Sequence, residues 1–152
     1  MLVIADSSAL IALDVCDALP LLSRLFHQVM VPRAMLEEVS VPGKAAAERL
    51  MAFLRDRVME VDVRRFVFET GSLGRGEVEA MALYREMNAD RLLMDDRRAR
   101  RIAQLNGISV LGTLGVLLAA KEAGLIERIG PHIARLRDSD IYFSDNSVKL
   151  QG

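Results

Sequence analysis

The sequence has few of the cysteines and histidines that cross-link small secreted proteins or form cysteine-rich metal clusters. Its 152 residues include one cysteine, two histidines and no tryptophan. A single cysteine excludes an intramolecular disulfide and any zinc site made of several cysteines, so Cys16 is expected to be a small, buried apolar residue. His27 and His132 lie far from acidic clusters in the sequence and have no second histidine at helical spacing. Both are interpreted as structural or surface residues.

The chain also lacks a long apolar run and a net charge of either sign. No segment approaches the about 20 apolar residues that cross a bilayer, and no basic region precedes the apolar start. Neither a membrane anchor nor a signal peptide is therefore expected, and a cytoplasmic protein is predicted. Lys and Arg number 20 against 21 Asp and Glu, a balance that by itself does not indicate nucleic-acid binding.

The length is that of one domain with a substantial core. Residues 1–143 are predicted to form this domain, and residues 144–152 a polar C-terminal tail. The hydrophobic content of 51% and the eight methionines are high for a small protein. They favour a helix-rich interior and an apolar face for self-association, as a homodimer or a larger homo-oligomer.

Short apolar segments alternate with helical patterns, which predicts an α/β fold with a mainly parallel sheet. Residues 2–5 are apolar on both faces and are expected to form a central strand. Residues 58–63 alternate apolar and acidic side chains and are placed on an edge. The other expected strands are 29–31, 91–94 and 109–111. Helices are expected over 9–15, 17–26, 44–57, 77–87, 97–105 and 114–122, and after Pro32 and Pro131.

Two of these strands end in acids, Asp6 after the first and Asp95 with Asp96 after the fourth. Parallel strands end at one rim of a sheet, and the helices that follow them begin there. Glu38 and Glu77, each near the start of a helix, are expected to approach the same rim. The alternative is that these acids only cap helices or favour their N-termini, as Asp and Glu do.

Several carboxylates in one place repel each other unless a cation lies among them. Oxygen ligands of this kind suit Mg²⁺ or Mn²⁺, and a water bound to such an ion can attack a phosphodiester. Ser8 and Thr113 are expected to orient waters or carboxylates around the ion. For Thr113, capping of the following helix is the simpler interpretation.

The glycines of residues 71–76 indicate a loop that bends sharply or approaches another backbone closely. The loop lacks the Lys-Ser/Thr ending of a phosphate-binding loop and the dinucleotide fingerprint, so nucleotide binding is rejected. A run of arginines follows Asp96. It is interpreted as a phosphate-binding patch or a solvated helix face, and it consists of Arg97, Arg98, Arg100 and Arg101.

Five stretches together resemble PIN domains. Residues 3–13 (VIADSSALIAL) resemble the opening PIN motif, and residues 31–39 (VPRAMLEEV) resemble the segment whose glutamate is the second acid. Residues 74–80, 92–100 and 110–117 resemble a PIN-like branch of small prokaryotic proteins that are predicted to bind nucleic acid.

This resemblance implies a three-layer α/β/α sandwich and a metal-dependent ribonuclease, similar to VapC-type toxins, with RNA as substrate and an antitoxin as partner. By position, the four family acids correspond to Asp6, Glu38, Glu77 and Asp96, with Asp95 as a neighbour. The register from the proline favours Glu38 over Glu37. Two features depart from the family pattern: Glu77 stands where aspartate is commoner, and no threonine precedes the last aspartates.

The sequence therefore leaves three alternative functions. The first is a Mg²⁺- or Mn²⁺-dependent RNA endonuclease whose arginines after Asp96 hold the RNA backbone. The second is a PIN-like module that binds nucleic acid or regulates without cleaving. The third is an oligomeric scaffold whose acids serve as helix caps.

Overall fold

The computed structural model describes residues 1–39, 45–66, 71 and 73–139. Five strands form its sheet: β1 (Leu2–Ala5), β2 (Gln28–Pro32), β3 (Val58–Met59), β4 (Arg91–Leu93) and β5 (Val110–Leu111). The helices are α1 (Ser7–Val15), α2 (Leu21–Leu25), α3 (Ala34–Val39), α4 (Ala45–Leu54), α5 (Arg75–Glu86), α6 (Arg97–Leu105), α7 (Thr113–Glu122) and α8 (Gly130–Arg137). A single 3₁₀ turn, η1 (Val63–Arg65), follows β3.

The sheet has the strand order β3-β2-β1-β4-β5, and every neighbouring pair is parallel. In register, Ile4 of β1 lies between Met30 of β2 and Leu92 of β4. The apolar strand at the start of the chain therefore occupies the centre, as predicted, because only a strand covered on both faces can be apolar throughout. The short strand β3 lies at one edge.

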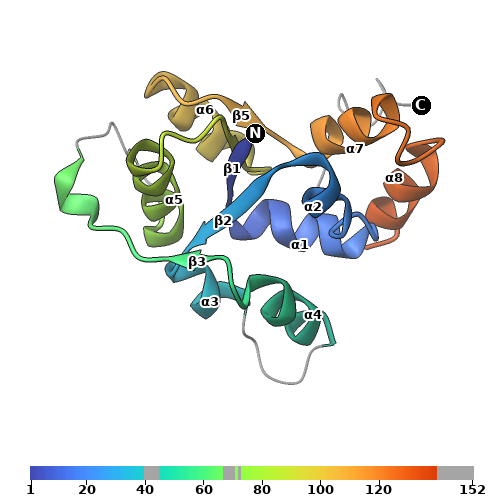
Figure 1. Ribbon diagram of the computed structural model, residues 1–152, viewed down its shortest axis with the longest axis horizontal. Helices are drawn as coiled ribbons and strands as arrows, with labels where there is room; N and C mark the ends of the chain where they lie inside the picture. The colour runs from blue at the N-terminus through green and yellow to red at the C-terminus, as the bar shows by residue number, and fades with distance from the viewer. Residues whose placement is uncertain (40–44, 67–70, 72, 140–152) are drawn as a thin grey trace.

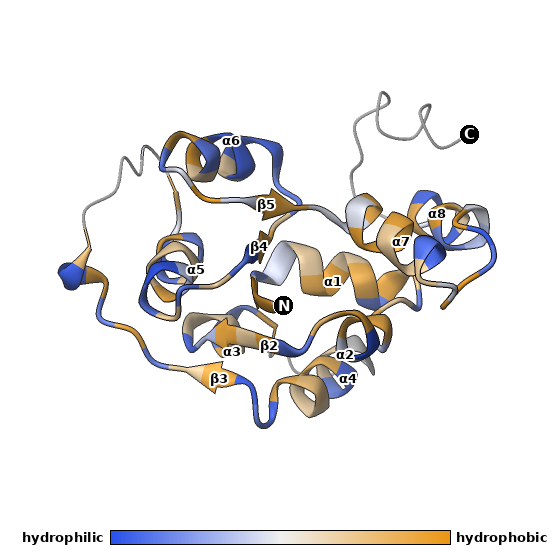
Figure 2. Ribbon diagram, turned by 45° about the horizontal axis from the view of Figure 1, so that its top comes forward, coloured by the Kyte–Doolittle hydropathy of each residue, from blue (hydrophilic) through white to orange (hydrophobic). Residues whose placement is uncertain are grey.

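Successive side chains of the strands face opposite layers of helices. Val3, Ala5 and Leu93 join a cluster with residues of α1, α2, α4, α7 and α8, whereas Ile4 and Leu92 pack with residues of α5 and α6. Figures 1 and 2 show α5 and α6 across the sheet from α1, α2, α7 and α8. The predicted three-layer α/β/α sandwich is confirmed.

The second helix is shorter than predicted. A helix was expected over residues 17–26, but α2 covers only Leu21–Leu25. Asp17 has a φ of 59°, in the left-handed region that ends regular helices, and Pro20 stands at the N-cap. A turn therefore separates α1 from α2.

The edge strand is also shorter than predicted. Of residues 58–63, only Val58 and Met59 pair with β2. The side chain of Asp62 accepts a hydrogen bond from the N–H of Arg64 and starts η1. A side-chain cap of this kind competes with strand pairing.

Cys16 is buried, as predicted, and burial raises the pKa of its thiol to about 11. The thiol is thus protonated and unreactive at neutral pH. His132 contacts the carbonyl oxygen of Cys16 through Nδ1, and His27 is exposed.

Over the described ranges, no helix is long and apolar enough to cross a membrane. The predicted C-terminal tail, residues 144–152, lies outside the described residues, and so does the predicted domain end at residue 143.

Candidate functional site

The sheet reverses its winding between β1 and β4. From β1, the chain adds β2 and β3 on one side and β4 and β5 on the other. Ligands of open α/β sheets bind outside the carboxyl ends of the strands at such a switch point. Asp6 directly follows β1, and its backbone N–H donates to the carbonyl of Leu93 at the end of β4 at 3.0 Å. Asp95 lies two residues beyond Leu93.

Ser8 connects these two aspartates. Its hydroxyl donates to Oδ1 of Asp6 at 2.7 Å and accepts from the backbone N–H of Asp95 at 3.1 Å. Thr113 completes the chain, because its N–H and its hydroxyl donate to the two carboxylate oxygens of Asp95 at 2.6 and 2.5 Å. Asp6 and Thr113 are 2% and 1% exposed. One buried network thus joins the ends of β1 and β4 to the start of α7.

The simpler interpretation of Thr113 was wrong. The N-cap of α7 is Gly112, and Thr113 is the first residue of the helix. A Cβ on Gly112 would lie 3.0 Å from Oδ1 of Asp95 and 3.0 Å from Nη1 of Arg100. A glycine here leaves room for both side chains, so Thr113 can hold Asp95. A glycine directly after a strand is the sequence signal for this role, and sequence reasoning did not use it.

Asp6 and Asp96 both cap helices, but only one of them also joins the network. Oδ1 of Asp6 accepts from the N–H of Ala9 at 3.1 Å and so caps α1. Asp96 is exposed, and its Oδ2 accepts from the N–H of Ala99 at 2.9 Å at the start of α6. Its position in the PIN-like sequence motif made Asp96 the expected fourth acid. In the structure it is Asp95 that is linked to Asp6, through Ser8.

The pKa values of both aspartates at the rim are raised. Burial raises the pKa of Asp6 to about 7, although the hydrogen bonds from Ser8 and Ala9 oppose this, and the charges of Asp95 and Glu77 raise it further. Burial also raises the pKa of Asp95, against the hydrogen bonds from Thr113 and the charge of Arg100. Desolvation and like charges both disfavour ionised carboxylates. Two ionised carboxylates at this rim are therefore costly when no cation lies between them.

Glu77 is near enough for its charge to act on Asp6, and Glu38 contacts the residues next to Asp6 and Glu77 in the chain. Glu77 is in the first turn of α5, and its Oε1 accepts from the N–H of Gly74 at 2.9 Å. The carboxylate of Glu38 accepts a hydrogen bond from the hydroxyl of Ser7 and lies against Gly76. Glu38 thus contacts the chain neighbours of Asp6 and of Glu77. Ser7 was given no role of its own from the sequence, and Gly76 was assigned to the glycine-rich loop, whereas it lies in the first turn of α5.

In the part of the chain that the structure describes, no three or more His, Cys, Asp or Glu side chains form a ready metal site. Asp6 and Asp95 nevertheless offer the hard oxygen atoms that Mg²⁺ prefers, and this ion is commonly held by one or two carboxylates while it keeps several waters. The chemistry of the donors therefore fits such an ion.

The arginines of α6 have different surroundings. Arg100 is half-buried and its guanidinium lies beside Asp95, whereas Arg97, Arg98 and Arg101 are exposed. Arg100 is thus a part of the electrostatics of the acidic rim, a role that the repeated arginines concealed in the sequence.

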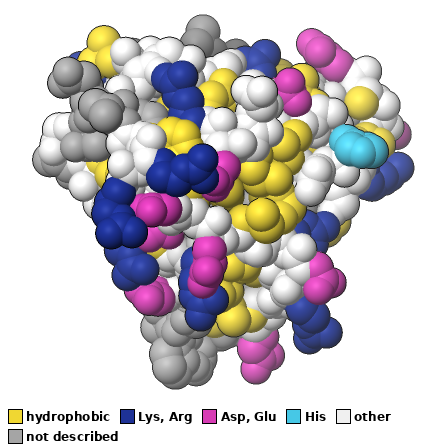
Figure 3. Space-filling model, turned by 60° about the vertical axis from the view of Figure 1, so that its left-hand side comes forward, with side chains coloured by type: hydrophobic (Ala, Val, Ile, Leu, Met, Phe, Trp, Pro, Cys, Tyr) yellow, Lys and Arg dark blue, Asp and Glu magenta, His cyan; other side chains and the backbone are white. Residues whose placement is uncertain are grey.

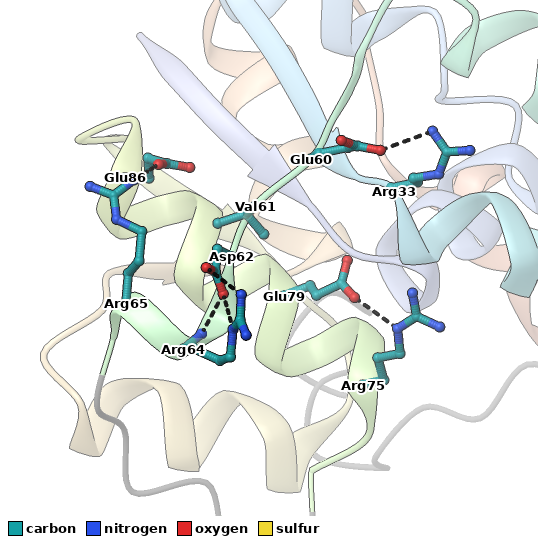
Figure 4. Close-up of a pocket in the computed structure, with 9 residues that line it drawn as sticks. All are labelled: Arg33, Glu60, Val61, Asp62, Arg64, Arg65, Arg75, Glu79 and Glu86. Atoms are coloured by element: carbon teal, nitrogen blue, oxygen red, sulfur yellow. Dashed lines mark hydrogen bonds and ion pairs between the residues drawn. The ribbon is translucent and has the colours of Figure 1, made fainter.

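A pocket of about 500 Å³ lies between the end of β3, η1 and α5 (Figure 4). Four of its arginines pair with acids, so its charges are mixed: Arg33 with Glu60, Arg64 with Asp62, Arg65 with Glu86, and Arg75 with Glu79. Figure 3 shows basic and acidic side chains intermixed on the side of the molecule that carries α5 and η1. This side is therefore no purely basic patch.

Comparisons with known proteins agree with this fold. A structural comparison matches a PilT N-terminus domain protein from the hyperthermophilic archaeon Sulfolobus solfataricus P2, with a TM-score of 0.57 and 17% identity, over 80% of this chain and 95% of that one. At this identity the likeness concerns the fold alone. No curated protein matches significantly. A family model described as a PIN domain matches residues 2–150. Because this match covers almost the whole sequence, the chain belongs to the PIN domain family.

Proposed function

We propose that the protein is an endoribonuclease of the PIN type that hydrolyses RNA phosphodiesters with a bound Mg²⁺ or Mn²⁺. PIN domains are generally nucleases, and this chain has their fold. The observation that carries the proposal is the hydrogen-bonded link from Asp6 through Ser8 to Asp95 at the switch point of the sheet. This link holds the carboxylate of Asp6 and the backbone of Asp95 where ligands of such sheets bind, and Thr113 holds the carboxylate of Asp95.

Asp6 and Asp95 are the central ligands in this proposal, and Glu38 and Glu77 complete the acidic rim. When bound, the cation supplies an activated water and stabilises the charge that develops on the phosphate. The protein's own contribution is orientation. Ser8 and Thr113 hold the carboxylates through hydrogen bonds, and partners of this kind strengthen metal binding.

We favour Asp95 over Asp96 as the ligand from the β4 loop. Asp95 is bonded to Ser8 through its N–H and to Thr113 through both of its carboxylate oxygens. Asp96 is exposed, and one of its oxygens caps α6. A carboxylate that is already oriented loses less conformational entropy when it binds an ion.

RNA is proposed to approach along α6. This helix starts directly after Asp96, so its first turn lies at the acidic rim. Arg97, Arg98 and Arg101 are exposed, and guanidinium groups bind phosphate oxygens strongly. Arg100, beside Asp95, balances charge at the rim instead.

The proposed activity is tested by cleavage of labelled single-stranded RNA with and without Mn²⁺. Wild-type protein is expected to cut only with the ion, and EDTA is expected to stop the reaction. The double variant Asp6→Asn with Asp95→Asn is expected to lose cleavage while its circular dichroism spectrum stays that of the wild type. Cleavage by this variant at the wild-type rate would contradict the assignment of the metal ligands.

A second candidate is a PIN-like module that binds RNA without cutting it. The lack of a preformed group of three ligands among the described side chains favours this function. Such a protein would shift RNA in a gel with Mn²⁺ present and yield no product. Cleavage that follows the Mn²⁺ concentration would exclude it.

The partners are also proposals. A toxin-like role calls for an antitoxin, whose gene would lie beside this one, and co-purification after co-expression tests this. Self-association is favoured by apolar side chains that are partly exposed, such as Ile11 at 37%, Met51 at 39% and Leu118 at 38%. Sedimentation of the full chain measures the number of subunits.

A further inference from the structure

Glu38 lies in a space that exists because residue 76 has no side chain. A Cβ on Gly76 would lie 2.0 Å from Oε1 of Glu38, 2.9 Å from its Cδ and 3.0 Å from Cε of Met35. The first distance is far shorter than any van der Waals contact between carbon and oxygen. The carboxylate of Glu38 therefore touches the backbone of the first turn of α5.

The first two turns of α5 also hold the helix that carries Glu38. Helix α3 has six residues, too few to be stable alone. Glu79 of α5 accepts from the N–H of Ala34, the first residue of α3, at 3.3 Å. Arg75 pairs with this Glu79 at 2.9 Å, as Figure 4 shows, and with Glu37 of α3 at 3.4 Å. Residues 75, 76 and 79 of α5 thus all contact α3.

On its other side, Glu38 is held by α1, because the hydroxyl of Ser7 donates to its carboxylate. An exposed glutamate normally samples several rotamers, and fixing one of them costs conformational entropy. Here the side chain is confined between Ser7, which follows Asp6, and Gly76, which precedes Glu77. These two contacts hold the carboxylate against the residue after Asp6 and the residue before Glu77.

We propose that Gly76 is a positioning residue, which keeps the carboxylate of Glu38 at the acidic rim for metal binding by leaving room for it. This inference rests on the proposed function and adds to it a reason for glycine at this position. The three atoms nearest to a methyl group at residue 76 belong to the flexible ends of Glu38 and Met35. Both can move aside, so alanine displaces the carboxylate while the fold remains.

The test is a double-mutant cycle that measures Mn²⁺ binding to the full chain by calorimetry, with no RNA present. Gly76→Ala is expected to lower the affinity about tenfold, the size of effect seen when a group that orients a metal ligand is removed. Glu38→Gln, which removes the charge of the oriented carboxylate itself, is expected to lower it by at least as much. In the Glu38→Gln background, Gly76→Ala is expected to cause no further loss, because the displaced carboxylate is already absent. The melting temperature of Gly76→Ala is expected to stay within a few degrees of the wild type.

Several outcomes would overturn this inference. An equal loss from Gly76→Ala in both backgrounds would show that the methyl acts through another group, and an unfolded Gly76→Ala chain would show a structural role only. If Glu38→Gln lowers the affinity and Gly76→Ala does not, the inference fails and the proposed function stands. If wild-type protein binds no Mn²⁺, the proposed function fails first. A crystal structure of Gly76→Ala with Glu38 still bonded to Ser7 would also overturn the inference.

Discussion

Ser8 and Asp95 are 87 residues apart in the sequence, yet the hydroxyl of Ser8 accepts a hydrogen bond from the N–H of Asp95 at 3.1 Å. The same hydroxyl donates to Asp6. One small side chain therefore fixes the separation between the ends of two neighbouring strands. The predictions below follow from this contact and from the groups around it.

Replacing Ser8 by alanine should weaken both folding and metal binding. The N–H of Asp95 loses its acceptor and Asp6 loses a donor, which should lower the free energy of unfolding by about 1 to 2 kcal/mol and the Mn²⁺ affinity about tenfold. Urea unfolding and calorimetry measure the two effects. Ser23→Ala is the control, since Ser23 is exposed and bonds only to Arg57 at 3.0 Å among the contacts described. Equal behaviour of the two variants would refute the role of Ser8.

Asp6 should make the metal-free protein less stable as the pH rises. Its pKa is about 7 in the folded chain, against an ordinary value of 3.8. Between these two values the folded state binds a proton that the unfolded state releases, so stability falls as the pH rises from about 4 to 7. Asp95, whose pKa is also raised, adds to the same trend.

Asp6→Asn removes most of this dependence because an amide does not titrate, and its oxygen can still accept the hydrogen bonds from Ser8 and Ala9. At pH 7 in EDTA, we expect this variant to be more stable than wild type by about 1 kcal/mol or more. Thermal unfolding at several pH values measures the difference. A variant with the same pH profile as the wild type would show that Asp6 is not the group responsible.

The variants Asp95→Asn and Asp96→Asn test which of the two aspartates after β4 is the metal ligand. Cleavage of RNA should fall at least about a hundredfold in Asp95→Asn, since the removed charge is that of a metal ligand. In Asp96→Asn it should change little, because asparagine also caps helices. Asp96→Ala should in addition lose about 1 kcal/mol of stability with the cap. The reverse order of activities would restore Asp96 as the ligand, as the family register suggests.

Charge reversal on α6 tests the RNA path. Arg97 and Arg101 are one turn apart, on one face of the helix, and both are exposed. Replacing both with glutamate should lower the slope of log affinity against log salt by about 1 to 2, since each lost phosphate contact removes about one released counterion. Arg24→Glu on α2 is the matched control. If the slope stays unchanged, these arginines belong to a solvated helix face.

Much of the fold was predictable because it depends on local patterns. The apolar run before Asp6 and the second one before Asp95 marked two buried parallel strands, and their acids were expected at one rim. The predicted helix over residues 17–26 failed at Asp17, whose left-handed conformation is rare for a residue other than glycine. The next residue, Ala18, turns back to donate its N–H to the carbonyl of Leu13 in α1. The helix propensity of a short segment does not predict such a turn.

The site was predictable in its residue types and less so in its roles. Asp6, Glu38, Glu77, Asp95 and Asp96 were all candidates, and their metal-binding role stays a prediction. Sequence spacing did not separate Asp95 from Asp96, because both follow the same strand. The choice depends on Ser8 and Thr113, which come from distant parts of the chain.

The sequence by itself determined the α/β class, the central place of the first strand and the gathering of acids at the carboxyl ends of strands, because hydrophobic period and strand direction are properties of short segments. Only the tertiary structure decided which aspartate after β4 Ser8 connects to Asp6, that Gly112 leaves room for Asp95, and that Gly76 leaves room for Glu38. These are contacts between different helices, strands and loops. They depend on how closely two backbones approach, and that distance is set by the packing of the whole domain.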